Sequence, residues 1–164
     1  MIVISDTSVI TNLAAIQHLL LLPQLYDRVI IPEAVYRELA DIKPPVPGTL
    51  EVQSASWLEV RQVFNREVVE RLQGEVSLDL GESEAIALAL ELNADLLLID
   101  ERRGRAEADR LGLRITGLLG ILVEARHQNL IVAVKPLMDA LIATSEFRVS
   151  LALYNQILEM VDEV

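Results

Sequence analysis

The sequence contains no cysteine and only two histidines, His18 and His127. Without cysteine the chain can form neither a disulfide framework nor a thiolate metal site, and only these two residues offer imidazole nitrogen. Any metal that the chain binds must therefore be held by oxygen ligands.

Long apolar runs and an excess of basic charge are also missing. Hydrophobic residues make up 52% of the 164 residues, yet no apolar run approaches the about 20 residues of a membrane span, and no cleavable signal pattern precedes the first predicted strand. We therefore expect a soluble, cytoplasmic protein. The net charge of −11 argues against a general nucleic-acid-binding surface and suits a site that concentrates cations.

The sequence does contain a repeated pattern in which an apolar strand ends at an acid. The first run ends at Asp6, and a later run ends at Asp100. Each is followed by a predicted helix, and this alternation predicts a parallel sheet with helices on both faces, a three-layer α/β/α fold. Asp6 and Asp100 would then share the sheet edge where ligands bind in such folds. A single acid there can equally be a helix cap.

Two further acids are expected on inward helix faces. A rotation of 100° per residue places Glu38 on the apolar face of the predicted helix 33–40, whereas Glu33 lies on its polar face. The predicted helix 80–92 is apolar nearly all round, so it should be largely buried. On it, Glu82 lies with Ala85, Ile86 and Ala89, whereas Glu84 lies with Ala87, Leu88 and Glu91. Glu82 is the better site candidate, although the helix dipole alone favours an acid in the first turn.

The remaining elements are consistent with one domain over residues 1–164. Helical spacing predicts a first helix after Ser8 that extends to Leu20. Further strands are expected at 28–32, 57–60 and 114–116, and helices at 64–72, 118–129, 136–144 and from 151 onward. The helices from about residue 118 should pack on the same domain. Residues 43–48, with three prolines and a glycine, are the one clear loop.

In order and setting, Asp6, Glu38, Glu82 and Asp100 resemble the acids of the PIN-domain nucleases, most closely the short single-domain branch related to VapC-type toxins. The resemblance covers about the first 120 residues. The matching segments are Ile4-Ser-Asp6-Thr-Ser8, Pro32-Glu-Ala-Val-Tyr-Arg-Glu38-Leu39, Leu80-Gly-Glu82-Ser-Glu-Ala-Ile-Ala-Leu-Ala89 and Leu97-Leu-Ile-Asp100-Glu-Arg-Arg-Gly-Arg105.

The resemblance implies a PIN fold, binding of Mg²⁺ or Mn²⁺ and endoribonuclease activity, with these four acids as metal-binding and catalytic residues. It also implies an RNA substrate, a homodimer and, if the chain is a toxin, a small antitoxin partner. Many VapC-type members have aspartate at the third acidic position, where this chain offers Glu82 with Glu84 close by.

The chemistry of such a site is that of hard cations. Converging carboxylates repel one another unless a cation compensates them, and Mg²⁺ takes oxygen ligands and keeps waters that can attack phosphorus. Secondary candidates for the site are the acids Glu84 and Glu101. The amide of Asn12 either orients a carboxylate or is satisfied in the core. The hydroxyls of Thr7, Ser8 and Thr116 either donate hydrogen bonds to water or phosphate or serve as caps. Arg102, Arg103 and Arg105 either contact the RNA backbone or form a solvated helix start.

Three alternatives fit less well. A phosphoreceiver domain needs an aspartate after a central strand and a later lysine, but no aspartate follows the predicted strand 57–60, and the only lysines are Lys43 and Lys135. An aspartyl-phosphate phosphatase needs an acid two residues after the first, where this chain has Ser8. The strongest rival is a PIN-like protein that no longer cleaves and acts as a binding or assembly module.

Overall fold

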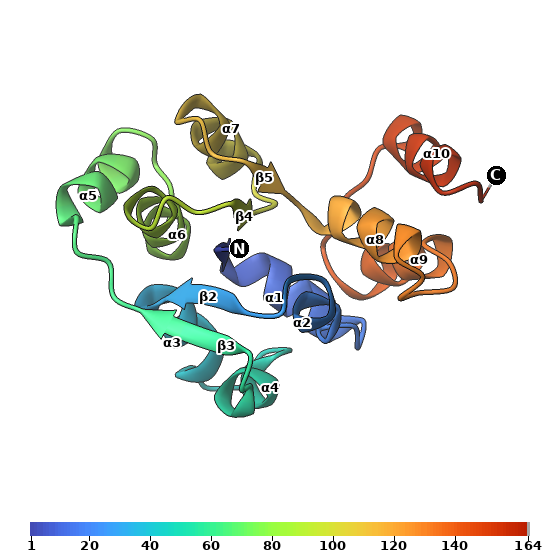
Figure 1. Ribbon diagram of the computed structural model, residues 1–164, viewed down its shortest axis with the longest axis horizontal. Coiled ribbons are helices and arrows are strands. Elements are labelled where there is room, and N and C mark those ends of the chain that lie inside the picture. Colours follow the sequence, from blue (N-terminus) through green and yellow to red (C-terminus); the bar gives the residue numbers. More distant parts are fainter. Residues whose placement is uncertain (164) are drawn as a thin grey trace.

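Five short strands form the centre of the protein, shown in Figure 1 as a computed structural model that describes residues 1–163. All neighbouring strands are parallel, which confirms the predicted three-layer α/β/α fold. In the spatial order β3-β2-β1-β4-β5, the strands are β3 (Leu58–Arg61), β2 (Val29–Pro32), β1 (Val3–Ser5), β4 (Leu96–Leu98) and β5 (Ile115–Thr116).

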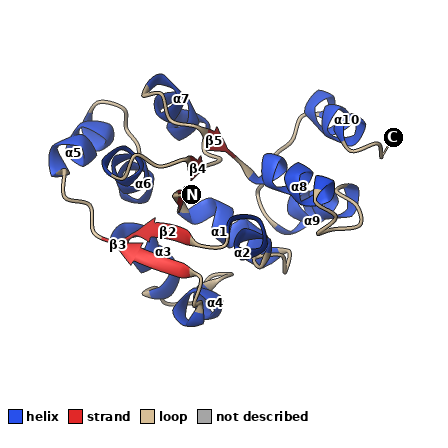
Figure 2. Cartoon of the chain, in the orientation of Figure 1, coloured by secondary structure: helices blue, strands red, loops and turns tan. Residues whose placement is uncertain are grey.

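Helices connect the strands and cover both faces of the sheet (Figure 2). Those before β4 are α1 (Thr7–Ala15), α2 (Leu21–Tyr26), α3 (Glu33–Ala40), α4 (Thr49–Ser54), α5 (Arg66–Gly74) and α6 (Leu80–Glu91). Those after β4 are α7 (Arg102–Arg110), α8 (Leu118–His127), α9 (Lys135–Thr144) and α10 (Leu151–Met160). Among residues 1–163, no helix is long and apolar enough to cross a membrane.

The two faces of the sheet are buried in separate apolar clusters because successive strand residues point to opposite sides. In β1, Val3 belongs to the cluster formed with α1, α2, α8, α9 and α10, whereas Ile4 belongs to the cluster formed with α5, α6 and α7. Met138 of α9 and Ile157 of α10 lie in the same cluster as Val9 of α1. The C-terminal helices thus share a core with the start of the chain.

The structure departs from the predicted elements at two places before β3. The first helix ends at Ala15, and the chain turns at Gln17, which has a φ of 60°, before α2 begins. Helices α2 and α4 were not predicted because each has six residues, fewer than two turns, and α4 begins after Gly48. Gly48 has a φ of +98°, in the left-handed region that glycine adopts without steric cost.

The strand register brings two chain segments together at the carboxyl edge of the sheet. Ser5 of β1 pairs with Leu98 of β4, and the backbone N–H of Asp6 donates to the carbonyl oxygen of Leu98 at 3.0 Å. The segments that carry Asp6 and Asp100 therefore leave the same edge side by side, as the sequence predicted.

Candidate functional site

Asp6 is the most central acid of this edge. It follows β1 directly, caps α1, and its side chain is only 3% exposed. One carboxylate oxygen accepts a hydrogen bond from the backbone N–H of Thr7, and the hydroxyl of Ser8 lies 3.4 Å from the other. Burial, together with the nearby charges of Asp79 and Glu38, raises the pKa of Asp6 to about 7. The folded protein therefore holds this carboxyl group in surroundings that disfavour its charge.

Glu38 reaches the same place from α3. Its Oε2 accepts a hydrogen bond from the Thr7 hydroxyl at 2.5 Å, and burial raises its pKa. The start of α6 passes close to this carboxylate, since a Cβ on Gly81 would lie 2.6 Å from Oε1 of Glu38. The glycine thus leaves the space that Glu38 occupies. Glu38 is half-buried while Glu33 is exposed, as the helical rotation predicted.

Glu82 completes a group of coupled acids. It lies in the first turn of α6 and is 7% exposed, and a Cβ on Gly104 of α7 would lie 3.9 Å from its Cδ. Burial, together with the charges of Asp79, Asp6 and Glu101, raises its pKa to about 8. None of the ion pairs within residues 1–163 involves Asp6, Glu38 or Glu82.

Asp79 is an acid of this site that the sequence reasoning missed. It caps α6 by accepting a hydrogen bond from the backbone N–H of Glu82 at 2.8 Å. Its charge raises the pKa of Asp6, Glu38 and Glu82. The signal that could have identified it is its position, three residues before Glu82 at the start of a predicted helix.

Glu84 has a different role from Glu82. The interpretation that only Glu82 faces inward is wrong, because α6 is buried from Gly81 to Ala89 and Glu84 is only 2% exposed. Glu84 Oε1 accepts from the backbone N–H of Ala34 at 3.0 Å, and Oε2 accepts from Arg66 Nη1 at 2.9 Å. Glu84 therefore ties α6 to the start of α3 and to α5, and its charge is compensated.

Asp100 lies at the same sheet edge but has other partners. Its carboxylate oxygens accept from the backbone N–H of Leu118 at 3.1 and 3.2 Å, at the start of α8. Burial raises its pKa to about 6, while the Leu118 N–H and the charge of Arg105 act in the opposite direction. Among residues 1–163, no other acid is a cause of this shift. The structure therefore couples three of the four predicted acids and sets Asp100 beside them.

The predicted secondary residues divide into those that contact the acids and those that do not. Thr7 and Ser8 donate to Glu38 and Asp6, so both orient carboxylates. Asn12 is half-buried, and within residues 1–163 its side chain makes no hydrogen bond to a carboxylate. Thr116 lies at the end of β5, close to Gly120. Glu101 precedes α7 and adds its negative charge near Glu82.

The three arginines that follow Asp100 face two different cavities. Arg102 and Arg103 line a cavity of about 680 Å³ together with Asp79, Glu82 and Glu101. Arg105 lines a second cavity of about 320 Å³ next to Asp100, and its Nη1 donates to the carbonyl oxygen of Ile99 at 2.9 Å. Basic side chains therefore stand beside the acids on both sides.

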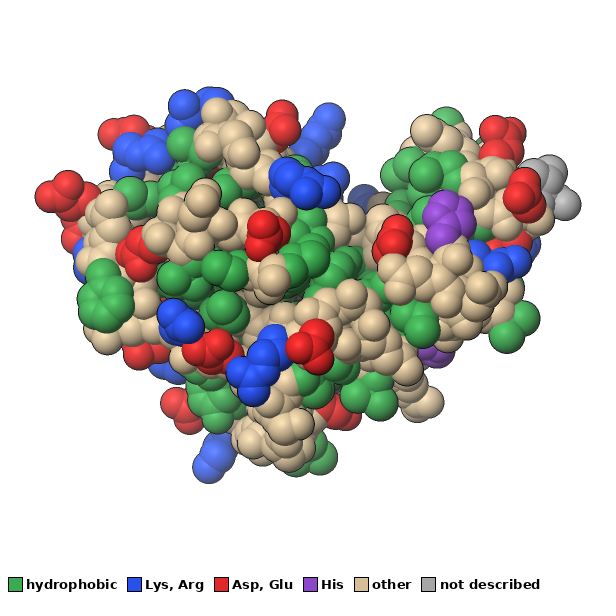
Figure 3. Space-filling model, in the orientation of Figure 1, with side chains coloured by type: hydrophobic (Ala, Val, Ile, Leu, Met, Phe, Trp, Pro, Cys, Tyr) green, Lys and Arg blue, Asp and Glu red, His purple; other side chains and the backbone are tan. Residues whose placement is uncertain are grey.

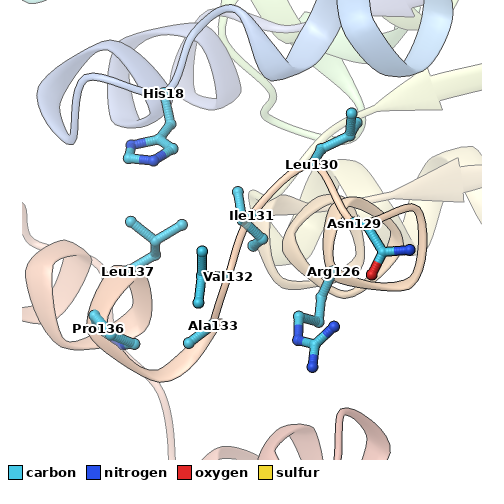
Figure 4. Close-up of a pocket in the computed structure, with 9 residues that line it drawn as sticks. All are labelled: His18, Arg126, Asn129, Leu130, Ile131, Val132, Ala133, Pro136 and Leu137. Carbon is cyan, nitrogen blue, oxygen red and sulfur yellow. The ribbon is translucent and has the colours of Figure 1, made fainter.

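A larger cavity lies away from the acids. It has a volume of about 740 Å³ and is lined by His18, Arg126 and mainly apolar residues of the segment between α8 and α9, as Figure 4 shows. No carboxylate of the residues that the structure describes lines it. The acidic edge, rather than this cavity, is therefore where the predicted chemistry belongs.

The coupled acids suit a hard divalent cation by their donor chemistry. All their ligand atoms are carboxylate oxygens, the preferred ligands of Mg²⁺ and Mn²⁺. Asp6 and Glu82 are buried, and neither forms an ion pair within residues 1–163. Among residues 1–163, however, no three Asp, Glu or His side chains are already gathered closely enough to hold a metal ion. The residues fit the cation chemically, while their side chains are not closed around it.

The fold and this edge define a parallel α/β protein with an acidic site at the carboxyl ends of its central strands. A family model described as a PIN domain matches residues 2–163, and the chain therefore belongs to the PIN-domain family. PIN domains are in general nucleases. The comparison with curated proteins finds no match.

Proposed function

We propose that the protein is a metal-dependent endoribonuclease that hydrolyses phosphodiester bonds of RNA. The observation that carries the proposal is the burial of Asp6 and Glu82, which are 3% and 7% exposed and form no ion pair in the described part of the chain, residues 1–163. Buried carboxylates are costly unless they are paired or bound to a metal. Their position at the carboxyl edge of a parallel sheet, in a PIN domain, supports a nuclease site rather than a structural one.

In this proposal Asp6, Glu38, Glu82 and Asp100 hold Mg²⁺ or Mn²⁺. Such an ion supplies polarisation of the scissile phosphate and a water of lowered pKa. The protein's own contribution is to fix the ligands. Thr7 orients Glu38 through its hydroxyl and Asp6 through its backbone N–H, while the Leu118 N–H holds Asp100. These hydrogen bonds hold the carboxylates near the edge of the sheet, and their side chains close around the ion when it binds.

The arginines of α7 supply the second element of the proposal. Arg102 and Arg103 line the cavity that contains Glu82, and Arg105 lies near Asp100. Guanidinium groups form bidentate hydrogen bonds to phosphate oxygens. They therefore offer contacts for the RNA backbone next to the acids, in a protein whose net charge of −11 would otherwise repel it.

Three finer points belong to the same proposal. The protein acts as a VapC-like toxin that a small antitoxin inhibits. It forms a homodimer, and it works in the cytoplasm. The alternative is a PIN-like binding or assembly module without activity. Glu82 favours the enzyme, because it is buried among other acids and forms no ion pair within residues 1–163, an arrangement that a binding module does not need.

The test is cleavage of a labelled single-stranded RNA by the purified protein. With Mg²⁺ or Mn²⁺ we expect internal cleavage products, which disappear in excess chelator and return when Mn²⁺ is restored. Cleavage that persists in chelator contradicts the metal-dependent mechanism. RNA binding without any cleavage in either metal favours the binding module.

A further inference from the structure

The cavity of about 320 Å³ beside Asp100 has features that the acidic site does not need. It is walled by Arg105 of α7, by Phe147 and Arg148 of the loop between α9 and α10, and by Leu153 of α10. In Figure 3 the surface is hollowed between the part formed by α7 and β5 and the part formed by α10. The C-terminal segment thus closes one side of a recess that begins at the candidate site.

Among residues 1–163, the two arginines outnumber the one acid that lines this recess, Asp100, and leave its lining with an excess of positive charge. Arg105 is held in place by its hydrogen bond to the Ile99 carbonyl oxygen at 2.9 Å. Arg148 is exposed and takes part in none of the ion pairs found within residues 1–163. A surface guanidinium without a carboxylate partner, in a chain with 25 acidic and 14 basic residues, is well suited to bind an external anion.

Phe147 supplies an aromatic wall. Its ring is half-buried and packs against the larger apolar cluster, so its position is fixed, and it also lines the cavity. Leu153 and Leu119 add apolar surface. The volume lies near the lower end of the range for small-molecule sites, about 300–1,000 Å³. It therefore suits a flat ring carrying one or two anionic groups better than it suits a larger ligand.

We propose that this cavity binds one unpaired nucleotide of the RNA strand, next to the scissile phosphate. Phe147 stacks on the base, and Arg105 and Arg148 contact the flanking phosphates. The inference rests on the proposed ribonuclease function and adds to it that the substrate is single-stranded at this position, because a base must leave its helix to stack on a protein ring. Stacking tolerates every base, so the contact strengthens binding without selecting a sequence.

The experiment compares matched variants in two measurements. The first is binding of a fluorescent single-stranded RNA in chelator, followed by anisotropy. The second is the kinetics of cleavage with Mg²⁺. The test variants are Phe147→Leu, which keeps an apolar side chain but removes the ring, Phe147→Tyr, which keeps the ring, and Arg148→Gln. The controls are Phe64→Leu and Arg28→Gln, at exposed positions that do not line the cavity.

We expect Phe147→Leu to weaken RNA binding and to raise KM by about tenfold, with kcat little changed, because stacking on one ring is lost. Phe147→Tyr should bind as the wild type does. Arg148→Gln should weaken RNA binding. It should also reduce the slope of log affinity against log salt concentration by about one, the amount expected for one lost phosphate contact. Both control variants should match the wild type, and a duplex of the same sequence should bind less tightly than the single strand.

Four results would overturn the inference. If Phe147→Leu and Phe147→Tyr weaken RNA binding equally, Phe147 acts only through packing. Unchanged binding and KM in Phe147→Leu and Arg148→Gln would mean that the nucleotide lies elsewhere. If Phe147→Leu does not fold, an unchanged affinity and salt dependence in Arg148→Gln would decide against the site. Equal binding of duplex and single strand would exclude a stacked base. By contrast, a wild-type protein that binds single-stranded RNA through Phe147 and Arg148 but never cleaves it would refute the proposed function alone.

Discussion

Glu82 and Glu84 lie two residues apart on the buried helix α6, and only Glu84 is bonded to a guanidinium. The ion pair joins Glu84 Oε2 to Arg66 Nη1 at 2.9 Å, whereas Glu82 has no cationic partner within residues 1–163 and its pKa is raised to about 8. The same helix therefore carries one acid that stabilises the fold and one that the fold holds at a cost. The first predictions follow from this difference.

Replacing each glutamate with glutamine should change stability in opposite directions. Glu82→Gln removes a buried charge that three nearby acids disfavour, so without metal, at about pH 8, it should stabilise the fold by about 1 kcal/mol or more. Glu84→Gln loses the charged hydrogen bond to the half-exposed Arg66 and should destabilise the fold by about 1–2 kcal/mol. Denaturant titration in chelator measures both. A loss of stability in Glu82→Gln would show that this carboxylate has a structural partner.

The stability of the metal-free protein should fall as the pH rises. The pKa values of Asp100, Asp6 and Glu82 are raised to about 6, about 7 and about 8, whereas unfolded carboxyl groups titrate near pH 4. Between about pH 4 and 8 the folded state therefore binds more protons than the unfolded state, and its stability falls across that interval.

Melting curves at about pH 5 and pH 8 in chelator test whether stability falls as the pH rises. We expect the higher melting temperature at the lower pH, and a smaller difference with saturating Mn²⁺, because a bound cation favours the charged carboxylates. A melting temperature that stays constant or rises toward pH 8 in chelator would mean that the acids are compensated within the fold.

The fold and most of the acidic edge could be predicted from sequence because they follow from local patterns. Apolar runs that end at Asp6 and Asp100 define strands, and parallel pairing then brings their ends together. The helical rotation could not separate Glu82 from Glu84, because a helix buried on all sides has no polar face to mark the orientation. The partner of Glu84 is Arg66, on another helix, and such a contact exists only in the assembled fold.

Asp79 and the recess near Asp100 show a second limit of the sequence. Asp79 follows a loop rather than a strand, so the pattern that singled out the other acids does not include it. Phe147 and Arg148 lie about 47 residues after Asp100 and reach it through the packing of α9 and α10 on the core. Spacing along the chain carries no signal for such a long-range arrangement.

A methyl group at position 81 should impair the site while leaving the fold intact. The Cβ of Gly81→Ala would lie 2.6 Å from Oε1 of Glu38, so the flexible carboxylate must move and its bond with Thr7 is disturbed. Alanine is favoured over glycine inside a helix by about 1 kcal/mol, which offsets the crowding. We expect a melting temperature close to that of the wild type and a marked loss of RNA cleavage.

The matched control is Gly74→Ala, because a Cβ at that position meets no atom within 4 Å. It should leave cleavage unchanged and keep or slightly raise the melting temperature, because alanine is favoured over glycine in a helix and nothing crowds it here. Full activity in Gly81→Ala would show that the position of Glu38 is not needed for catalysis.

Asp100→Asn should separate a metal-binding role from a structural one. The amide oxygen of asparagine can still accept the Leu118 N–H, and one negative charge is removed, so the metal-free variant should be as stable as the wild type or more so. Mn²⁺ at a hundredfold excess over its dissociation constant should stabilise the wild type by about 2.7 kcal/mol, and most of this response should be lost in the variant. A destabilised Asp100→Asn that still responds fully to Mn²⁺ would remove Asp100 from the site.

The central claim is that unpaired acids at the carboxyl edge form a metal-dependent ribonuclease site, and RNA cleavage by the two α6 variants tests it most directly. Rates are measured with Mn²⁺ and in chelator, per mole of folded protein, so that the lower stability of Glu84→Gln does not enter. We predict that the wild type cleaves only with Mn²⁺, that Glu82→Gln is slower by about a hundredfold or more, and that Glu84→Gln keeps most of the wild-type rate. Equal losses in the two variants, or cleavage that survives in chelator, would contradict the account.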